Sequence, residues 1–441
     1  APAFRPECRG FHMSFPFAWN EFADQPHNVA PKSERLRYHF RHAGSYVDLA
    51  WSNIVRAAPI IANLARYRAG MYKRPVILSN AFGLAVSPTA DGDADPLDFL
   101  AETGVRETLL RIPSWEKDRL GDYERFARRV RDRGFGLVLA LLQRRDDVFD
   151  LAGWTEFLDE VFDRFGPLAS HFEIGHAWNR TKWGLWSFRE YLDLARPAFD
   201  LAPKIGVKLI GPAVIDFEFH LYPPTLSRLP FDKVSSLLYV DRTGPPESRQ
   251  FGWSAAGKAA LLKAVVDASS RAGRDGWVTE VNWPLKGTGP YSPAAGRPNV
   301  SEDEQASYLV RYYIPLLAGG LVERIYWWQL AAPGYGLVDT RGGAWRRRPA
   351  FAAFRTLVRE LDESEFIGRA GRGPARIFYF KKGGEYTAVA WSAGKTCEFE
   401  FAVPARRALN RDGAEASGSG GRRFRLEGSP LYVVFSERPV P

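Results

Sequence analysis

The sequence predicts an α/β protein: a (β/α)8 TIM barrel with an N-terminal helical extension and a small C-terminal antiparallel β-domain. Short apolar runs alternate with helical-period segments between residues 74 and 361, and eight such units fit the size of one barrel. After residue 361, short segments in which apolar and polar residues alternate predict further strands. The chain of 441 residues is too long for one hydrophobic core, because single cores stop growing near about 250–300 residues. We expect three parts, 1–73, 74–361 and 362–441.

Eight apolar runs of strand length predict the barrel strands. They are 74–86, 107–115, 136–145, 171–175, 206–214, 234–240, 276–281 and 324–330. Helical segments fall between most of them, and the last opens with a capping box, Ser301 followed by Glu304. A doubly wound open sheet would usually carry a Gly-rich phosphate turn after its first strand, and the sequence contains neither GxGxxG nor a P-loop. The pattern favours a barrel, whose functional residues lie at the carboxyl ends of the strands.

The two ends of the chain differ in pattern from the barrel. Residues 1–73 hold an aromatic loop, GFHMSFPFAWNEF, and then a basic amphipathic region. We interpret this region as a helical extension packed on the barrel, and the alternative is a surface in 30–73 that docks on a membrane or a partner. After residue 361, strands separated by Gly-rich turns predict an antiparallel sheet or small sandwich.

Composition narrows the classes of function. The hydrophobic share of 45% and the 14 tryptophans describe a globular protein with aromatic side chains to spare for binding. The net charge of +9 favours anionic partners, but acidic residues are interleaved with the basic ones, so we expect no nucleic acid. Two cysteines, Cys8 and Cys397, exclude a disulfide framework and a Cys-based metal site.

No motif in the sequence indicates a metal or a cofactor. Seven histidines are scattered without an HExxH spacing, and no GxSxG is present. No segment has the roughly 20 apolar residues that span a bilayer. The best candidate, 49–67, is interrupted by Arg56 and Pro59. We expect a bacterial cytoplasmic or peripheral membrane location.

Two carboxylates follow apolar strands, Glu173 in HFEIGHAWN and Glu280 in WVTEVNWP. Glycoside hydrolysis needs two carboxyl groups that flank the scissile bond. WVTEVNWP resembles the seventh-strand nucleophile motif of glycoside hydrolase clan A, and family 39 in particular. Arg111 in LLRIP is similar to the second-strand arginine of that family, and Tyr239 in SSLLYV to its sixth-strand tyrosine. This resemblance covers roughly 75–360 and implies a barrel glycosidase with Glu280 as its nucleophile.

The fourth strand departs from the family pattern. Where the family ends this strand with EIGNEP, the sequence reads EIGHAW, so that His176, Ala177 and Trp178 replace the sugar-binding Asn, the acid/base Glu and the Pro. Leu237 replaces a family His on the sixth strand. The nucleophile position is filled and the usual acid position is empty.

Several residues are candidates for the missing acid. His176, Asp216, Glu218 and Asp241 lie at strand ends, and Asp241 shares the side of its strand with Tyr239. Glu173 lies two pleat repeats deeper than residue 177, at about 3.3 Å per residue. We interpret it as a core carboxylate paired with an arginine such as Arg111, with a catalytic role as the alternative.

Aromatic and polar residues at the strand ends are candidates for sugar binding. Trp283, Trp327 and Trp328 follow the seventh and eighth strands, and we expect at most two of them to stack on sugar rings. Beyond the fourth strand, Asn179 and the basic residues of NRTKWGLW are placed to hold an acidic sugar or a phosphate. A solvated loop anchored by its tryptophans is the alternative.

These features predict a glycoside hydrolase-like protein that acts through Glu280 on a complex, acidic bacterial surface glycan. The alternatives are a non-catalytic carbohydrate-binding or scaffold protein of polysaccharide or lipopolysaccharide assembly, and a transglycosylase that uses an activated donor. The partner is a carbohydrate in each case.

Overall fold

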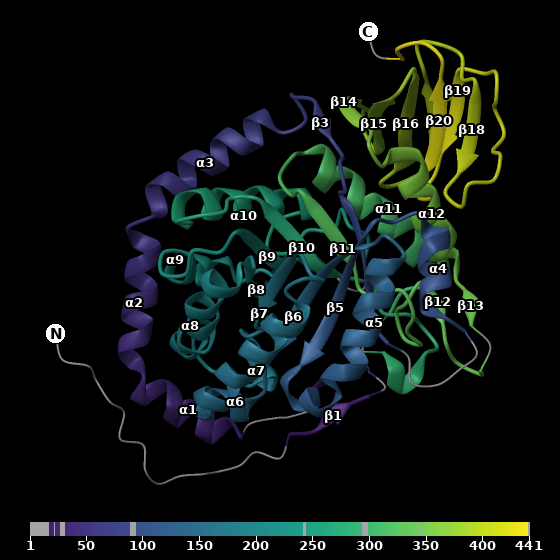
Figure 1. Ribbon diagram of the computed structural model, residues 1–441. Helices are drawn as coiled ribbons and strands as arrows, with labels where there is room; N and C mark the ends of the chain where they lie inside the picture. Colours follow the sequence, from purple (N-terminus) through teal and green to yellow (C-terminus); the bar gives the residue numbers. More distant parts are fainter. Residues whose placement is uncertain are drawn as a thin grey trace.

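The computed structural model describes residues 17–21, 23–26, 31–88, 94–240, 244–292, 299–343 and 345–439. Its centre is a closed barrel of eight parallel strands in sequence order, which confirms the predicted (β/α)8 fold (Figure 1). The strands are β4 (Phe82–Val86), β5 (Glu107–Pro113), β6 (Gly136–Leu142), β7 (His171–Ile174), β8 (Leu209–Ile215), β9 (Lys233–Leu237), β10 (Gly276–Val281) and β11 (Arg324–Trp327).

Helices follow the strands and surround the barrel. They are α4 (Pro96–Thr103), α5 (Leu120–Asp132), α6 (Arg145–Phe149), α7 (Leu151–Phe165), α8 (Phe188–Ile205), α9 (Tyr222–Leu226), α10 (Ala255–Ser269), α11 (Glu302–Ala318) and α12 (Pro349–Leu361), with the 3-10 turns η1 (Ser114–Arg119), η2 (Thr181–Trp183), η3 (Phe219–Leu221) and η4 (Gly289–Tyr291). The predicted capping box opens α11: Ser301 Oγ accepts from the backbone of Glu304, whose carboxylate accepts from the backbone of Ser301.

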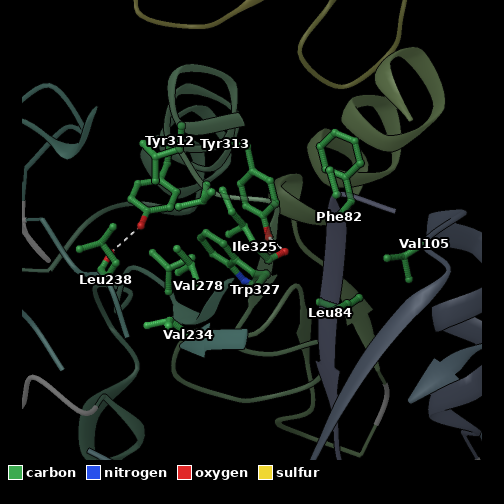
Figure 2. Close-up of a cluster of buried hydrophobic side chains, with 14 of the residues drawn as sticks. Phe82, Leu84, Val105, Val234, Leu238, Val278, Tyr312, Tyr313, Ile325 and Trp327 are labelled. Carbon is green, nitrogen blue, oxygen red and sulfur yellow. Dashed lines mark hydrogen bonds between the residues drawn. The ribbon is translucent and has the colours of Figure 1, made fainter. Parts of the chain in front are cut away.

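Alternation along each strand divides the apolar side chains between two cores. An outer core lies between the strands and the helices, and a smaller cluster fills the barrel interior. Figure 2 shows part of the outer core, where the hydroxyl of Tyr312 donates to the carbonyl of Leu238 at 2.5 Å and that of Tyr313 to Ile325 at 3.3 Å. These bonds tie α11 to the strands beneath it and let tyrosines occupy an apolar layer.

The C-terminal part forms antiparallel sheets, as predicted. The strands are β14 (Glu365–Ala370), β15 (Ala375–Lys382), β16 (Glu385–Ser392), β17 (Cys397–Glu400), β18 (Arg407–Asn410), β19 (Arg423–Leu426) and β20 (Leu431–Phe435). The main sheet has the order β18-β20-β16-β15-β14-β3, and β17 pairs with β19. A separate apolar cluster joins the two sheets, which gives the arrangement of a small sandwich.

The first predicted strand, 74–86, is wrong as a single element. Residues of β3 (Val76–Ile77) pair with β14 in the C-terminal sheet, and only β4 belongs to the barrel. Between them Asn80 has a φ of 50°, a left-handed conformation that asparagine tolerates better than most residues. This bend turns one apolar run into two strands of different sheets.

The N-terminal extension consists of α1 (Lys32–Arg41), α2 (Ala43–Ile54) and α3 (Ala57–Gly70), which run along one flank of the barrel (Figure 1, purple). Helix α2 contacts α9, and α3 contacts α10. Before them, β1 (Trp19–Asn20) and β2 (Gln25–Pro26) form a short hairpin. A further antiparallel pair, β12 (Val338–Asp339) and β13 (Arg346–Arg347), follows the barrel. Among the described residues, no helix has the length and apolar character of a membrane span.

Candidate active site

A β-bulge in β10 directs Glu280 into the barrel. The pairing of β10 with β11 shifts register between Val278 and Val281, and both valines belong to the outer core. The bulge lets the two residues between them, Thr279 and Glu280, both face inward, where strict alternation would turn one of them outward. A bulge at the rim of a barrel is a common way to re-aim a functional side chain.

The carboxylate of Glu280 is held by three side chains. It accepts hydrogen bonds from the guanidinium of Arg111 and the hydroxyl of Tyr239, and Nε2 of His176 lies 3.3 Å away. Only 8% of Glu280 is exposed. Burial alone would raise its pKa, but the charge of Arg111, the contact with His176 and the bond from Tyr239 hold the pKa of Glu280 well below its usual range. Glu280 is therefore an oriented anion.

Arg111, at the inner face of β5, organises the floor of the site. Its guanidinium lies 3.3 Å from the centre of the Trp328 ring, a cation–π contact. One terminal nitrogen donates to Glu280 and lies 3.0 Å from Nε2 of His176, while the other lies 3.4 Å from a carboxylate oxygen of Asp24. A single guanidinium thus connects two carboxylates and an imidazole.

His176 is buried beside Glu280 and is neutral near pH 7. Its backbone nitrogen donates to Gln143 at 2.8 Å, and its ring meets that of Trp183 edge-on at 4.6 Å. Burial and then the charge of Arg111 lower the pKa of His176 to about 4, against the opposing effect of Glu280. A neutral imidazole is a poor proton donor to a leaving group, so the geometry assigns His176 to the support of Glu280.

Ala177 occupies the position of the expected acid. It is fully buried, with a φ of 42°, and its backbone nitrogen donates to the carbonyl of Ala213 at 3.1 Å. A methyl group there has no proton to give.

Glu173 lies deeper in the barrel than Glu280. Thr279 donates to it at 2.6 Å, so its hydrogen-bond partner is a hydroxyl, whereas Arg111 pairs with Glu280. Burial raises the pKa of Glu173 to about 7, although hydrogen bonds from Ser235 and Thr279 oppose the rise. With 1% of its surface exposed, it has the setting of a core carboxylate.

The three candidate tryptophans lie on two sides of the barrel wall. Trp283 and Trp327 stack in the outer core with their rings 6.1 Å apart, and the indole of Trp283 donates to the carbonyl of Gly244. Figure 2 shows Trp327 among the apolar side chains behind the strands. Only Trp328 of the three belongs to the interior cluster, while Trp283 and Trp327 belong to the outer core. This agrees with the expectation that at most two of the three stack on sugar rings, which stays a prediction.

The polar residues after β7 and β8 are engaged in structural contacts. Asn179 exchanges two hydrogen bonds with the backbone of Ile215, at 2.9 and 3.0 Å. Arg180 forms ion pairs with both Asp216 and Glu218. Both carboxylates are therefore engaged with the side chain of Arg180. Asp241, the remaining candidate, lies outside the described residues.

The N-terminal hairpin adds residues that the sequence patterns did not connect with the site. Trp19 lies with its ring 5.1 Å from Trp115, just after β5, and 5.9 Å from Trp183, after β7. Between β1 and β2, Asp24 reaches both Arg111 and the hydroxyl of Tyr335, each at 3.4 Å. The hairpin therefore lies over the carboxyl ends of the barrel strands.

Asp24 has the electrostatic setting of a proton donor. Burial raises its pKa to about 6, with Arg111 opposing the rise and the negative charge of Glu280 adding to it. The hydrogen bond from Tyr335 lowers the pKa and the charge of Glu116 raises it. The aromatic loop quoted above was the only sequence signal, and nothing in it shows which strand ends it contacts.

The described residues offer no cluster of three or more His, Cys, Asp or Glu side chains that could hold a metal ion. The site is built from carboxylates, one guanidinium, one imidazole, hydroxyls and aromatic rings.

A scan of protein families gives no match to this chain, and a search of curated proteins gives none either. Solved structures do match. A family 39 glycoside hydrolase from Bacteroides cellulosilyticus WH2 has a TM-score of 0.65 at 15% identity, over 81% of each chain. A family 30 endoxylanase from Clostridium papyrosolvens C71 has a TM-score of 0.57 at 12% identity, over 82% of this chain and 98% of that one.

A family 51 arabinofuranosidase from Xanthomonas axonopodis pv. citri has a TM-score of 0.56 at 11% identity, over 82% of this chain and 98% of that one. The chain shares the fold of these clan A glycosidases. The resemblance read from its strand ends is confirmed at the level of the fold, and at such identities the likeness concerns the fold alone.

Proposed function

We propose that the protein is a retaining glycoside hydrolase with Glu280 as its nucleophile. The observation that carries this proposal is the anionic carboxylate of Glu280, re-aimed by a bulge and oriented by Arg111, Tyr239 and His176. A nucleophile must be ionised and fixed in direction, and this arrangement meets both conditions.

Asp24 supplies the acid that Ala177 cannot. Asp24 and Glu280 contact different nitrogens of one planar guanidinium, which brings both carboxyl groups to the same site. A retaining enzyme holds its two catalytic carboxyl groups about 5–5.5 Å apart. With a pKa of about 6, Asp24 is half protonated near pH 6 and about one-tenth protonated at pH 7, which is enough for it to act as a general acid.

The steps follow from these two roles. An oxygen of Glu280 bonds to the anomeric carbon as the glycosidic bond breaks, and the leaving oxygen keeps that electron pair and takes the proton of Asp24. Glycosylation removes the negative charge of Glu280, which had raised the pKa of Asp24, so Asp24 becomes a base. Water then gives its proton to Asp24, bonds to the anomeric carbon and releases Glu280.

The substrate class is a complex, acidic bacterial surface glycan. Lys182 lies beside the hairpin, where it donates to Gln25, and its charge favours an anionic partner at this end of the barrel. Trp19, Trp115 and Trp183 offer aromatic surface at the mouth of the barrel.

Aryl glycosides with good leaving groups test the proposal, because they need little help from an acid. We expect turnover by the native protein, loss of at least about 10³-fold in Glu280→Gln, and glycosyl azide in the presence of azide. Glu218→Gln, at an arginine-paired carboxylate, is the matched control and should retain the rate. Turnover that survives Glu280→Gln would contradict the proposal.

A non-catalytic carbohydrate-binding protein is the second candidate, favoured by the buried methyl of Ala177 and by Leu237 where the family has a histidine. It predicts glycan binding without turnover, in the native protein and in Glu280→Gln alike. A transglycosylase with an activated donor would instead give transfer to an acceptor sugar.

A further inference from the structure

Helix α2 presents its apolar side to solvent and its polar side to the protein. The residues that face the barrel are mostly polar, with Ser45 and Ser52 buried and Asp48 half-buried. On the opposite side, Trp51 and Ile54 are each 64% exposed. A surface helix of a globular protein has the reverse arrangement, with its apolar stripe turned to the core.

The exposed apolar side chains continue onto the neighbouring helices. Among the described residues, eight of the twelve exposed large apolar side chains lie between positions 36 and 61. Beyond Trp51 and Ile54, the most exposed are Phe40 on α1, Val47 also on α2, and Ile61 on α3, at 75%, 71% and 66%. Such a concentration on one flank marks an interaction surface.

Basic residues accompany the apolar ones. Residues 31–74 contain nine Lys and Arg against two Asp and Glu, a net charge of +7 out of the +9 of the whole chain. One of the two acids, Asp48, faces inward and is paired with Arg228 at 2.7 Å. Arg37 and Arg41 of α1 are exposed next to Phe40, so this part of the flank is apolar and cationic at the same time. Arg66 of α3, by contrast, is paired with Asp267 of α10.

The extension is fixed to the barrel through its polar side. Asn53 of α2 donates to the carbonyl of His220 at 2.8 Å, and Tyr67 of α3 donates to Asp267 of α10. The exposed face is thus presented by anchored helices along the flank seen in Figure 1.

We propose that the outer face of α1–α3 docks on an anionic lipid bilayer. Helices that lie in the plane of a membrane place Trp, Phe and aliphatic side chains among the acyl chains while Lys and Arg meet the headgroups. A second copy of this chain fits the face poorly, because it would bring the exposed Arg37 and Arg41 of two chains together. A nucleic acid would leave the apolar side chains uncovered.

Vesicle sedimentation of the full chain tests this docking. We expect the protein to pellet with phosphatidylglycerol-rich vesicles, to stay in solution with pure phosphatidylcholine vesicles, and to lose binding as salt is raised. Trp51→Glu combined with Ile54→Glu should weaken vesicle binding at least about tenfold, since each substitution removes a side chain that would enter the bilayer. Phe251→Glu, at a side chain 82% exposed on a barrel loop, is the matched control.

Equal binding to both vesicle types, binding that persists in the Trp51/Ile54 variant, or an equal loss in the Phe251 variant would overturn the proposal. A dimer by light scattering that Trp51→Glu converts to a monomer would assign the face to self-association instead. Activity on aryl glycosides is a separate readout, so the docking and the proposed hydrolysis stand or fall independently.

Discussion

At the scale of single residues, the proposed mechanism replaces the carboxyl group that is missing at Ala177 with one from a different part of the chain. Ala177 cannot donate a proton, and Asp24, separated by 87 residues from Arg111 in sequence, meets it in space. Motifs at strand ends revealed Glu280, Arg111 and Tyr239 because their chemistry is local to each strand. Asp24 could not be predicted in this way, because its role depends on a tertiary contact.

Asp24→Asn tests the replacement directly. Because the acid must be protonated, activity of the native protein on glycosides with poor leaving groups should fall as the pH rises through about 6. The variant should lose about 10²–10⁴-fold on those substrates and far less on activated ones. Plots of the rate against leaving-group pKa, for the native protein and for Asp24→Asn, report this difference. If the variant were faster than the native protein on every substrate, Asp24 would obstruct the cleft rather than donate a proton.

Glu173→Gln tests the buried carboxylate below the site. The folded-state pKa of Glu173, about 7, exceeds its usual 4.5, so the native state binds this proton more tightly and loses stability as the pH rises from about 4.5 to 7. The loss is roughly 3 kcal/mol, from about 1.4 kcal/mol per pKa unit. Urea unfolding should find the variant more stable than the native protein near pH 8. If the difference in free energy of unfolding between the two proteins did not change with pH, the raised pKa of Glu173 would be refuted.

At the scale of elements, period and length predicted the strands, while the irregularities of the strands were not predictable. The eight apolar runs gave the barrel because parallel strands buried on both faces are continuously apolar. The bulge in β10 depends on the pairing with β11, and the split of 74–86 depends on the C-terminal sheet. The bulge and the split both depend on pairing with a strand that is distant in sequence, and the local sequence does not show which strand that is.

Neighbouring positions at the end of β11 give a paired prediction. Trp327→Ala should destabilise the protein by about 3–5 kcal/mol, because it empties a site in the outer core, and should spare catalysis per folded molecule. Trp328→Ala removes the ring under Arg111 and should lower kcat more than its stability loss explains. Thermal unfolding and kinetics on the same samples separate the loss of stability from the loss of kcat. If the two variants lost stability and kcat in the same proportion, the assignment of Trp327 to the outer core and Trp328 to the barrel interior would be contradicted.

At the scale of the whole molecule, the barrel and the C-terminal sheets are tied at several points. The buried Arg411 donates to Ser307 and to Asp303 at the start of α11, each at 2.7 Å, and the indole of Trp391 donates to Glu247 at 2.8 Å. Strand β3 also joins the C-terminal sheet immediately before the barrel begins. The division of the chain into three parts, with boundaries at 73 and 361, stays a prediction.

These ties predict one calorimetric unfolding transition for the native protein. Arg411→Ala removes the hydrogen bonds of a buried cation to Ser307 and Asp303 and should cost about 1.5–3 kcal/mol, lowering the melting temperature of the sheets before that of the barrel. Arg423→Ala, at an exposed ion pair, should change stability by less than about 1 kcal/mol. Two separate transitions in the native protein would contradict the coupling.

The most direct test of the central claim is to trap the glycosyl-enzyme. A 2-deoxy-2-fluoro glycoside with an activated leaving group slows the second step, so a retaining enzyme accumulates its covalent intermediate. Peptide mass spectrometry should then find the sugar on Glu280, with no label in Glu280→Gln. A label on another carboxylate, or turnover with inversion and no label, would contradict the assignment of Glu280 as nucleophile.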